Sequence, residues 1–287
     1  MHIPDLDTRW DPDAAAQLLS RRQLVELDQE HPGFRDADYR ARRDRIARVA
    51  FDYREGPVPE VEYTEEEHAV WRVIWAELEA RHTARASSAF LDTCGDLDLP
   101  KDRIPQLEWV SARLQAHSGF RLAPVAGLVH PRVFMGHLGE GVFLSTQYIR
   151  HHSAPLYTPE PDVVHELIGH GATLIHPGIA QVSKRFGQVA QMADAELLTA
   201  LTRVYWYTLE FGLVEEGGEV KAFGAGVLSS VGEMDRAPRA PHRAWDIDEM
   251  ARTDFDPTMY QPFYYVGPGV DQMLSDLNEW LDSQAAT

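Results

Sequence analysis

The segment "VHELIGHG", Val164 to Gly171, constrains the fold more than any other part of the chain. In the zinc-hydrolase signature H-E-x-x-H the histidines are four positions apart, whereas His165 and His170 are five positions apart. At about 100° per residue, five helical steps leave two side chains roughly 140° apart, so a straight α-helix cannot direct both to one ion. If the two imidazoles meet, the backbone must depart from an ideal helix, and Gly169 is where such a departure costs least.

Helical periodicity dominates the rest of the chain. In "YTEEEHAVWRVIWAELEARH", Thr64 and Glu67 have the spacing of a capping box, and apolar side chains follow at helical intervals. The segments "DRIARVAFDYRE" and "AELLTALTRVYWYTLEFG" repeat the pattern, the second between Asp194 and Gly212. Strand-like segments are short: "RLAPVAGL", "EGVFLSTQYI", "EVKAFGAGVL" and "QPFYYV". We therefore predict a mainly α fold with short β-strands.

An excess of acidic residues limits the partners of the protein. Its 287 residues carry 45 Asp and Glu against 27 Lys and Arg, a net charge of −18, which repels nucleic acid and anionic membranes. The single cysteine, Cys94, excludes an intramolecular disulfide. The start has no signal-peptide pattern, and no run approaches the roughly 20 apolar residues of a membrane span. We predict a cytoplasmic protein, monomeric or a small homo-oligomer, that binds a small molecule.

The candidate metal ligands are two histidines and one carboxylate. A redox metal that leaves room for oxygen and a substrate needs few protein ligands, and two His with one carboxylate on one face of the ion meet that need. His165 and His170 supply the imidazoles, whereas isolated histidines such as His82 are expected on helix surfaces. Glu210, among the aromatic residues of "YWYTLEFGL", is the best carboxylate because a buried Glu needs a cation. Glu166 is the rival, although neighbours on a helix point about 100° apart.

Several motifs resemble one known family in the same order. "TPEPDVVHELIGHG", "VYWYTLEFGL", "FGAGVLSSVGE" and "QPFYYV" closely resemble the catalytic domain of the pterin-dependent aromatic amino acid hydroxylases. Other segments, among them "HPGFRDADYRARR" and "STQYIRH", extend the resemblance over roughly His31 to Val266. It implies a single hydroxylase-like catalytic domain at residues 31–283, after an N-terminal extension, residues 1–30, that we expect to be loosely held. No regulatory or tetramerisation domain is expected.

The resemblance implies an Fe(II) centre and a tetrahydropterin cofactor such as tetrahydrobiopterin, with O2 as co-substrate. The iron ligands would be His165, His170 and Glu210, and Glu166 would be a further catalytic residue beside the pterin. The pterin ring would stack on Phe134. The implied pterin-binding residues are Gly127, Val129, Arg132, Phe134, Glu166 and Tyr205.

The same resemblance implies a site for a free aromatic L-amino acid, with hydroxylation of L-phenylalanine to L-tyrosine as the leading reaction. Arg150, held by Asp162, would bind the substrate carboxylate, because a guanidinium fork suits a planar carboxylate. Pro161 and Trp206 would wall the slot for the aromatic ring. The implied substrate-binding residues are Arg150, Tyr157, Thr158, Pro161, Asp162, Trp206, Gly226 and Ser229.

Alternatives concern both the substrate and the class of function. Leu144 and Pro257 differ from the residues that animal members carry, so meta-hydroxylation of phenylalanine and hydroxylation of tryptophan or tyrosine stay open. A zinc hydrolase that uses His165, His170 and Glu166 is a more remote alternative. A non-catalytic helical module with a structural metal is another.

Overall fold

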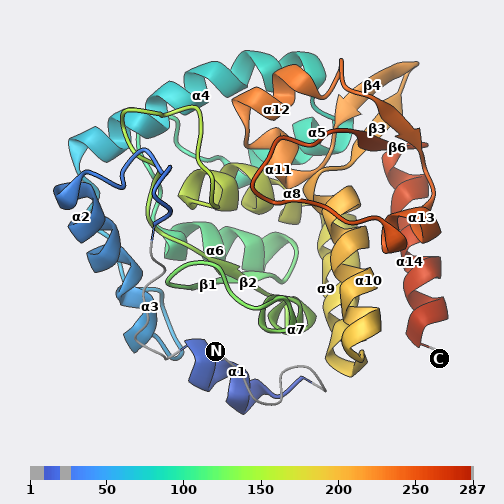
Figure 1. The fold of residues 1–287 in the computed structure, drawn as a ribbon, viewed down its shortest axis with the longest axis horizontal. Coiled ribbons are helices and arrows are strands. Elements are labelled where there is room, and N and C mark those ends of the chain that lie inside the picture. The colour runs from blue at the N-terminus through green and yellow to red at the C-terminus, as the bar shows by residue number, and fades with distance from the viewer. Residues whose placement is uncertain (1–9, 20–26, 286–287) are drawn as a thin grey trace.

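The computed structural model describes residues 10–19 and 27–285, in which helices predominate over short strands (Figure 1). The prediction of a mainly α fold is confirmed. The α-helices are α1 (Pro12–Leu19), α2 (Ala37–Ala47), α3 (Val49–Asp52), α4 (Glu65–Arg85), α5 (Ser88–Leu97), α6 (Leu107–His117), α7 (Pro131–Gly139), α8 (Ala172–Leu174), α9 (Pro177–Met192), α10 (Ala195–Tyr205), α11 (Ala225–Leu228), α12 (Val231–Arg236), α13 (Ile247–Arg252) and α14 (Val270–Ala285). Two π-helices, η1 (His165–Gly171) and η2 (Trp206–Glu210), continue into α8 and from α10, respectively.

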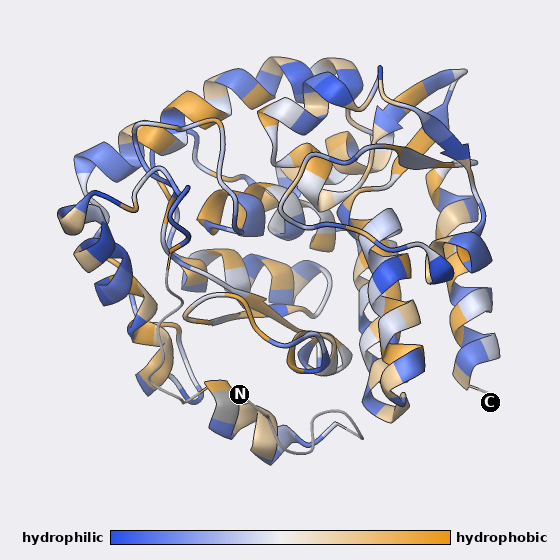
Figure 2. Cartoon of the chain, in the orientation of Figure 1, coloured by the Kyte–Doolittle hydropathy of each residue, from blue (hydrophilic) through white to orange (hydrophobic). Residues whose placement is uncertain are grey.

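Helix α4 forms as its sequence predicts. The Thr64 side chain accepts a hydrogen bond from the Glu67 backbone N–H at 3.2 Å, and the Glu67 carboxylate accepts one from the Thr64 N–H at 2.7 Å. The predicted apolar stripe turns inward, because Trp71, Ile74 and Leu78 are fully buried at 0% exposure. Hydrophilic residues alternate with this stripe along the helix, as Figure 2 shows. Burial of these three side chains contributes roughly 1.5–3 kcal/mol each.

Two small sheets complete the framework. Strand β1 (Arg121–Pro124) pairs in parallel with β2 (Val142–Ser145), and the second sheet has the order β4 (Glu219–Ala222), β3 (Leu213–Glu216), β6 (Tyr264–Gly267), β5 (His242–Ala244). All of β2 is buried, which suits a strand covered on both faces. The chain leaves β2 toward residues 146–152, which include Arg150. The short sheets therefore position segments that supply side chains to the site.

Part of the N-terminal extension packs against the domain. An added Cβ at Gly136 would lie 2.1 Å from the ring of Trp10, so the indole rests directly on α7. Ala15 of α1 is fully buried at 0% exposure. The expectation of a loosely held extension therefore does not apply to residues 10–19, whereas residues 1–9 and 20–26 lie outside the described part of the chain.

Three local predictions need correction. The helical segment 44–55 divides between α2 and α3. The strand predicted from "EVKAFGAGVL" ends at Ala222, and α11 follows. Gly224 lies between β4 and α11, where an added Cβ would lie 2.4 Å from the Glu210 carbonyl oxygen, so a residue without a side chain is needed at this point. His82 is not on a helix surface: it is 5% exposed, and its Nε2 lies 2.7 Å from the Leu228 carbonyl oxygen.

No helix within the described residues is both long enough and apolar enough to span a bilayer.

Candidate active site

The π-helix η1 resolves the five-residue spacing of His165 and His170. A π-helix closes its hydrogen bonds between residues five apart, so one extra residue fits into each turn. The two imidazole rings consequently lie on the same side of the helix, with centroids 4.7 Å apart. The predicted departure from an ideal α-helix is confirmed, and it extends over the whole of residues 165–171.

Glu210 brings a carboxylate to the same point from the end of η2. Its Oε1 lies 3.2 Å from Nε2 of His165, and its Oε2 lies 2.9 Å from Nε2 of His170. One ligand atom from each residue lies within 4.8 Å of the other two. Two ligand atoms about 2.1 Å from an ion and at right angles are about 3.0 Å apart, so the spacing suits a shared metal ion. His170 and Glu210 are buried, which keeps the carboxylate away from bulk water.

Ser229 orients the imidazole ring of His165. The Ser229 hydroxyl donates to the Ala225 carbonyl at 2.8 Å, so its oxygen accepts the Nδ1–H of His165 at 3.1 Å. This assignment leaves the Nε2 lone pair of His165 facing Glu210 Oε1. Two acceptor atoms 3.2 Å apart repel each other unless a cation lies between them. The residues present therefore fit a divalent metal.

Burial shapes the charge states of the site. Desolvation lowers the pKa of His165 to about 4, against the opposing charge of Glu210. Desolvation alone would raise the pKa of Glu210, but the neighbouring His170 and His165 outweigh it and leave that pKa below its usual value. Burial raises the pKa of Glu166 to about 7, although His170 and two hydrogen bonds from Thr146 act in the other direction. An ionised Glu210 beside a neutral His165 is the donor set that a cation requires.

Gly169 is needed for close packing between His165 and His170 and the neighbouring helix α11. Its Cβ, if present, would lie 2.6 Å from the Ala225 backbone oxygen of α11. We expect Gly169→Ala to lower the free energy of unfolding by about 1–3 kcal/mol, because backbone atoms must move to admit the methyl group. Urea unfolding followed by circular dichroism measures this change.

The matched control is Gly95→Ala in α5, where an added Cβ meets nothing within 4 Å. There we expect a gain of up to about 1 kcal/mol from the better helix propensity of alanine. Equal effects of the two substitutions would contradict the packing role of Gly169.

Two cavities of about 250 Å³ each meet at the converging ligands. The first, here called the aromatic cavity, is lined by Gly127, Val129, Phe134, Thr146, Glu166 and Tyr205. The second, called the arginine cavity, is lined by Arg150, Tyr157, Thr158, Pro161, Gly226 and Ser229. Both cavities share Pro161, Trp206, His165 and Glu210. The candidate metal site therefore lies where two bound small molecules, one in each cavity, could approach one ion from different sides.

The aromatic cavity has a wall of perpendicular rings. Phe134 stands edge to face with Phe143 at 5.6 Å and with Tyr205 at 5.8 Å. The structure places five of the six predicted pterin-binding residues in this lining. Arg132 is the exception: it is fully buried and donates to the carbonyl oxygens of Ala190 and Ala193 at 3.1 and 3.0 Å. Its guanidinium ties α7 to the end of α9 and does not line the cavity.

The arginine cavity presents one positioned cation. Arg150 donates through Nε and Nη2 to Asp162 at 2.9 and 2.8 Å, a fork that leaves Nη1 for a ligand. Asp162 is 1% exposed and holds Arg150 without lining the cavity itself. All other predicted substrate-binding residues line it. Trp206 stacks on Phe255 with ring centroids 4.2 Å apart and donates to the Gln261 side chain at 3.0 Å, so its indole is fixed.

Some contributing residues were not predicted. Thr146 holds Glu166, and Gln261 holds Trp206, and both lie inside the motifs "STQYIRH" and "QPFYYV" that carry the family resemblance. Leu128 lies in the segment from Gly127 to Arg132, which the resemblance places beside the pterin, and it lines both cavities although it is 66% exposed. Leu144 lines the aromatic cavity and Pro257 lines the arginine cavity.

In this mainly helical domain, two imidazoles and one carboxylate converge on one point. This is the arrangement of a facial-triad metal site, in which some coordination positions of the ion stay open. The sequence profile of the biopterin-dependent aromatic amino acid hydroxylases matches residues 7–285, and the chain belongs to this family. The match begins well before His31, the first residue of the motifs that resemble the family.

Relatives of two substrate types are similarly close. The chain is 43% identical to phenylalanine-4-hydroxylase of Rattus norvegicus over 95% of its length, and 40% identical to tyrosine 3-monooxygenase of Schistosoma mansoni over 98%. It spans 60% and 61% of these relatives' own lengths.

Solved structures share the fold. A single-substitution variant of phenylalanine hydroxylase from Chromobacterium violaceum is 30% identical with a TM-score of 0.72, covering 78% of this chain and 84% of that one. The cold-active phenylalanine hydroxylase of Colwellia psychrerythraea also has a TM-score of 0.72 at 30% identity, covering 81% of this chain and 94% of that one.

Proposed function

We propose that the chain is an Fe(II)- and tetrahydropterin-dependent monooxygenase that hydroxylates a free aromatic L-amino acid, with L-phenylalanine to L-tyrosine as the leading reaction. The observation that carries the proposal is the convergence of His165, His170 and Glu210 where the aromatic and arginine cavities meet. Family membership supports the class of reaction. We also propose that residues 31–283 act as one catalytic unit.

Iron would be held by the Nε2 atoms of His165 and His170 and by the Glu210 carboxylate. A structure of the Chromobacterium violaceum enzyme is described as holding iron(III) and 7,8-dihydrobiopterin, and another as bound to cobalt. When bound, iron and tetrahydropterin supply the electrons that activate O2. The residues of this chain bind and orient the reactants and exclude water.

The aromatic cavity is the proposed pterin site. The ring of Phe134 offers a face for stacking, and its perpendicular neighbours, Phe143 and Tyr205, hold it in that orientation. The Glu166 carboxyl group, fixed by Thr146 at 3.1 Å, would exchange a hydrogen bond with the pterin ring. The apolar wall limits the water that could divert the reduced cofactor to an unproductive reaction.

The arginine cavity is the proposed amino acid site. Nη1 of Arg150 would bind the substrate carboxylate, while Asp162 holds the guanidinium plane. Pro161 and Trp206 line both cavities, so a ring placed between them lies beside the metal. Orientation by residues that are themselves fixed brings the ring edge to the reacting position.

Phenylalanine is the preferred substrate in this proposal. The solved relatives compared above are described as phenylalanine hydroxylases. Tyrosine, tryptophan and meta-hydroxylation of phenylalanine are the alternatives, because a tyrosine 3-monooxygenase is nearly as similar in sequence. Leu144 lines the aromatic cavity and Pro257 lines the arginine cavity. We expect substitutions at these two positions to change which aromatic amino acid is preferred.

Ser229 should affect iron binding without being a ligand. Loss of its hydroxyl frees the His165 ring, and removal of such an outer partner typically costs about 10- to 100-fold in metal affinity. We expect Ser229→Ala to weaken Fe(II) binding by this factor, measured by competition with a chromogenic chelator under anaerobic conditions.

Ser118→Ala is the matched control, since the Ser118 hydroxyl also donates to a carbonyl four residues earlier, at 3.1 Å, but lines neither cavity. Wild-type iron affinity in Ser229→Ala would show that the hydroxyl does not orient His165.

The cellular setting is part of the proposal. The net charge of −18 favours small-molecule partners over nucleic acid or anionic membranes. We propose a cytoplasmic enzyme that is monomeric or a small homo-oligomer.

The decisive test is a competition among substrates. Protein loaded anaerobically with Fe(II) is mixed with O2, tetrahydrobiopterin and equimolar phenylalanine, tyrosine and tryptophan, and the products are separated by retention time and mass. We expect tyrosine formed from isotopically labelled phenylalanine, dependent on both iron and pterin. A different hydroxylated product would replace phenylalanine or para attack with the alternative it identifies. Hydrolytic activity with zinc and without pterin would overturn the monooxygenase proposal.

A further inference from the structure

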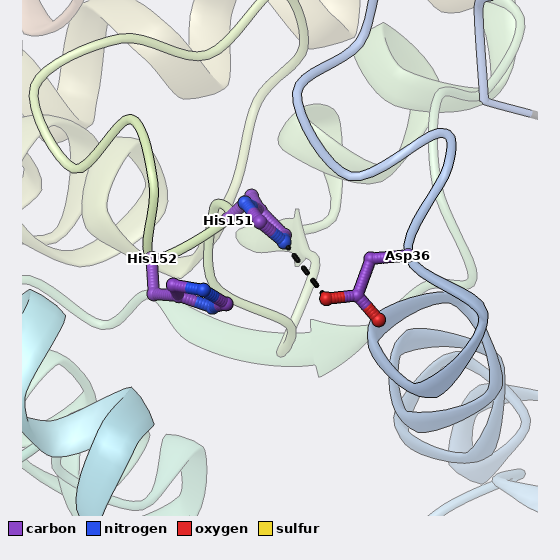
Figure 3. Close-up of side chains that lie close together, drawn as sticks. All are labelled: Asp36, His151 and His152. Atoms are coloured by element: carbon purple, nitrogen blue, oxygen red, sulfur yellow. Dashed lines mark hydrogen bonds and ion pairs between the residues drawn. The ribbon is translucent and has the colours of Figure 1, made fainter.

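A second group of metal-ligating side chains lies outside the active site. Asp36, at the N-cap of α2, meets His151 and His152, which follow β2 in the chain. Figure 3 shows one oxygen of the Asp36 carboxylate joined to the His151 ring, with the His152 ring beside it. His151 Nε2 lies 3.2 Å from Asp36 Oδ2, and one ligand atom of each residue lies within 4.8 Å of the other two.

Each of the three side chains is held by a further partner. Asp36 Oδ1 accepts the backbone N–H groups of Asp38 and Tyr39 at 3.0 and 2.9 Å, which leaves Oδ2 for another ligand. His151 Nδ1 lies 2.7 Å from the Ser153 hydroxyl, and His152 Nδ1 lies 3.5 Å from a Glu66 carboxylate oxygen. His151 Nδ1 also accepts the Ser153 backbone N–H at 3.2 Å, so the neutral ring carries its proton on Nε2 and donates it to Asp36 Oδ2. An ion on Nε2 therefore requires the ring to change tautomer, whereas His152 Nδ1 already has the carboxylate partner that metal-binding histidines usually have.

We propose that Asp36, His151 and His152 bind a divalent transition-metal ion of the zinc type. Two ligand atoms each about 2.1 Å from a tetrahedral ion lie about 3.4 Å apart. The observed 3.2 Å between His151 Nε2 and Asp36 Oδ2 is close to this spacing, so an ion would replace the hydrogen bond between them with little movement of the two side chains. Two nitrogen donors and one oxygen donor suit Zn²⁺, Co²⁺, Ni²⁺ or Cu²⁺, whereas Mg²⁺ and Ca²⁺ prefer oxygen alone.

The exposure of the cluster suits binding from solution. His151 is buried and fixed, whereas the side chains of His152 and Asp36 are 43% and 35% exposed. Water can therefore complete the coordination, and an ion can enter without unfolding. The carboxylate of Glu66, itself 67% exposed, adds negative charge beside His152. Of the arginines that line the same hollow, Arg42 is paired with Glu67 and Arg150 with Asp162.

The ion would connect two segments that are distant in the chain. Asp36 belongs to the start of α2, and His151 directly follows Arg150, whose guanidinium lines the arginine cavity. Tyr39 already links the same segments, because its hydroxyl donates to the Ile149 carbonyl at 3.0 Å. The bound ion would be a structural tether that stabilises the segment carrying Arg150, and it shares no ligand with the triad at Glu210.

Zinc content tests the proposal directly. Metal-free protein is incubated with Zn²⁺, passed over a desalting column and analysed for zinc per chain, and its melting temperature is recorded with and without zinc. We expect the wild type to retain one zinc ion more than His152→Ala and to show a larger zinc-dependent rise in melting temperature. Because His152 is exposed, its substitution should leave the fold intact.

Two further variants make the result specific. His117→Ala removes another exposed histidine, in α6, and should retain as much zinc as the wild type. Glu210→Ala should lose the zinc of the triad and retain the zinc of the proposed cluster. Equal zinc content in the wild type and His152→Ala would overturn the proposal, as would loss of all zinc in Glu210→Ala.

Discussion

Substitution of Glu210 by alanine is expected to abolish iron-dependent turnover. The carboxylate is the one negatively charged member of the triad, and its two oxygens lie 3.2 and 2.9 Å from the histidine nitrogens. Even the loss of an outer partner typically costs about 10- to 100-fold in affinity or activity, so the loss of a direct ligand should cost at least on the order of a hundredfold. Iron content after desalting and the hydroxylation rate are the measurements.

The fold should survive this change. Removing Glu210 leaves His165 and His170 without their carboxylate partner, but a neutral imidazole is far cheaper to bury than an unpaired charge. Glu196→Ala, at an exposed position of α10, is the matched control and should keep full iron content. Hydroxylation at the wild-type rate in Glu210→Ala would show that Glu210 is not a metal ligand. A loss of the helical circular dichroism signal would show that the variant loses activity because it unfolds.

Substitution of Arg150 by lysine is expected to raise the KM for the amino acid by about 10- to 100-fold. A hydrogen bond to a charged group contributes about 1.5–3 kcal/mol, and lysine cannot reproduce the guanidinium fork that orients the side chain on Asp162. The KM for tetrahydropterin should change little, because Arg150 does not line the aromatic cavity. Steady-state kinetics with each reactant varied in turn separates the two effects.

Lysine is preferred to alanine here for a physical reason. Asp162 is 1% exposed, and removing its forked partner would leave a buried charge uncompensated, at a cost of about 3–5 kcal/mol. Arg81→Lys is the matched control, since Arg81 forms the same kind of fork with Asp235 at 3.1 and 2.8 Å but lines neither cavity. An increase in the pterin KM alone would contradict the role proposed for Arg150.

The sequence predicts those helices and caps that depend on contacts between neighbours along the chain. The capping box at Thr64 and the buried stripe of α4 depend on residues three and four positions apart, so both can be predicted from the sequence. The convergence of His165, His170 and Glu210 was also predicted, from the five-residue histidine spacing, the aromatic residues around Glu210 and the family resemblance. Motifs in family order supplied most of the residues that line the two cavities.

Long-range contacts decided what the sequence left open. The family resemblance implies that Arg132 binds the pterin, but its guanidinium donates to the carbonyl oxygens of Ala190, in α9, and Ala193, directly after α9. His82 was expected on a helix surface because it is an isolated histidine, but it lies four residues after Leu78 on the buried side of α4, where α11 supplies the Leu228 carbonyl. No local pattern specifies which distant backbone will lie against a side chain.

The sequence by itself therefore determined the helical class, the ends of its clearest helix and the residue types of the candidate metal site. Only the tertiary structure decided that η1 is a π-helix, that Ser229 orients His165, and that α11 packs on Gly169. The physical reason is the range of the interactions. Helix periodicity and capping act over a few residues, whereas the Ser229 and Ala225 contacts join segments more than fifty positions apart, and these form only when the whole core packs.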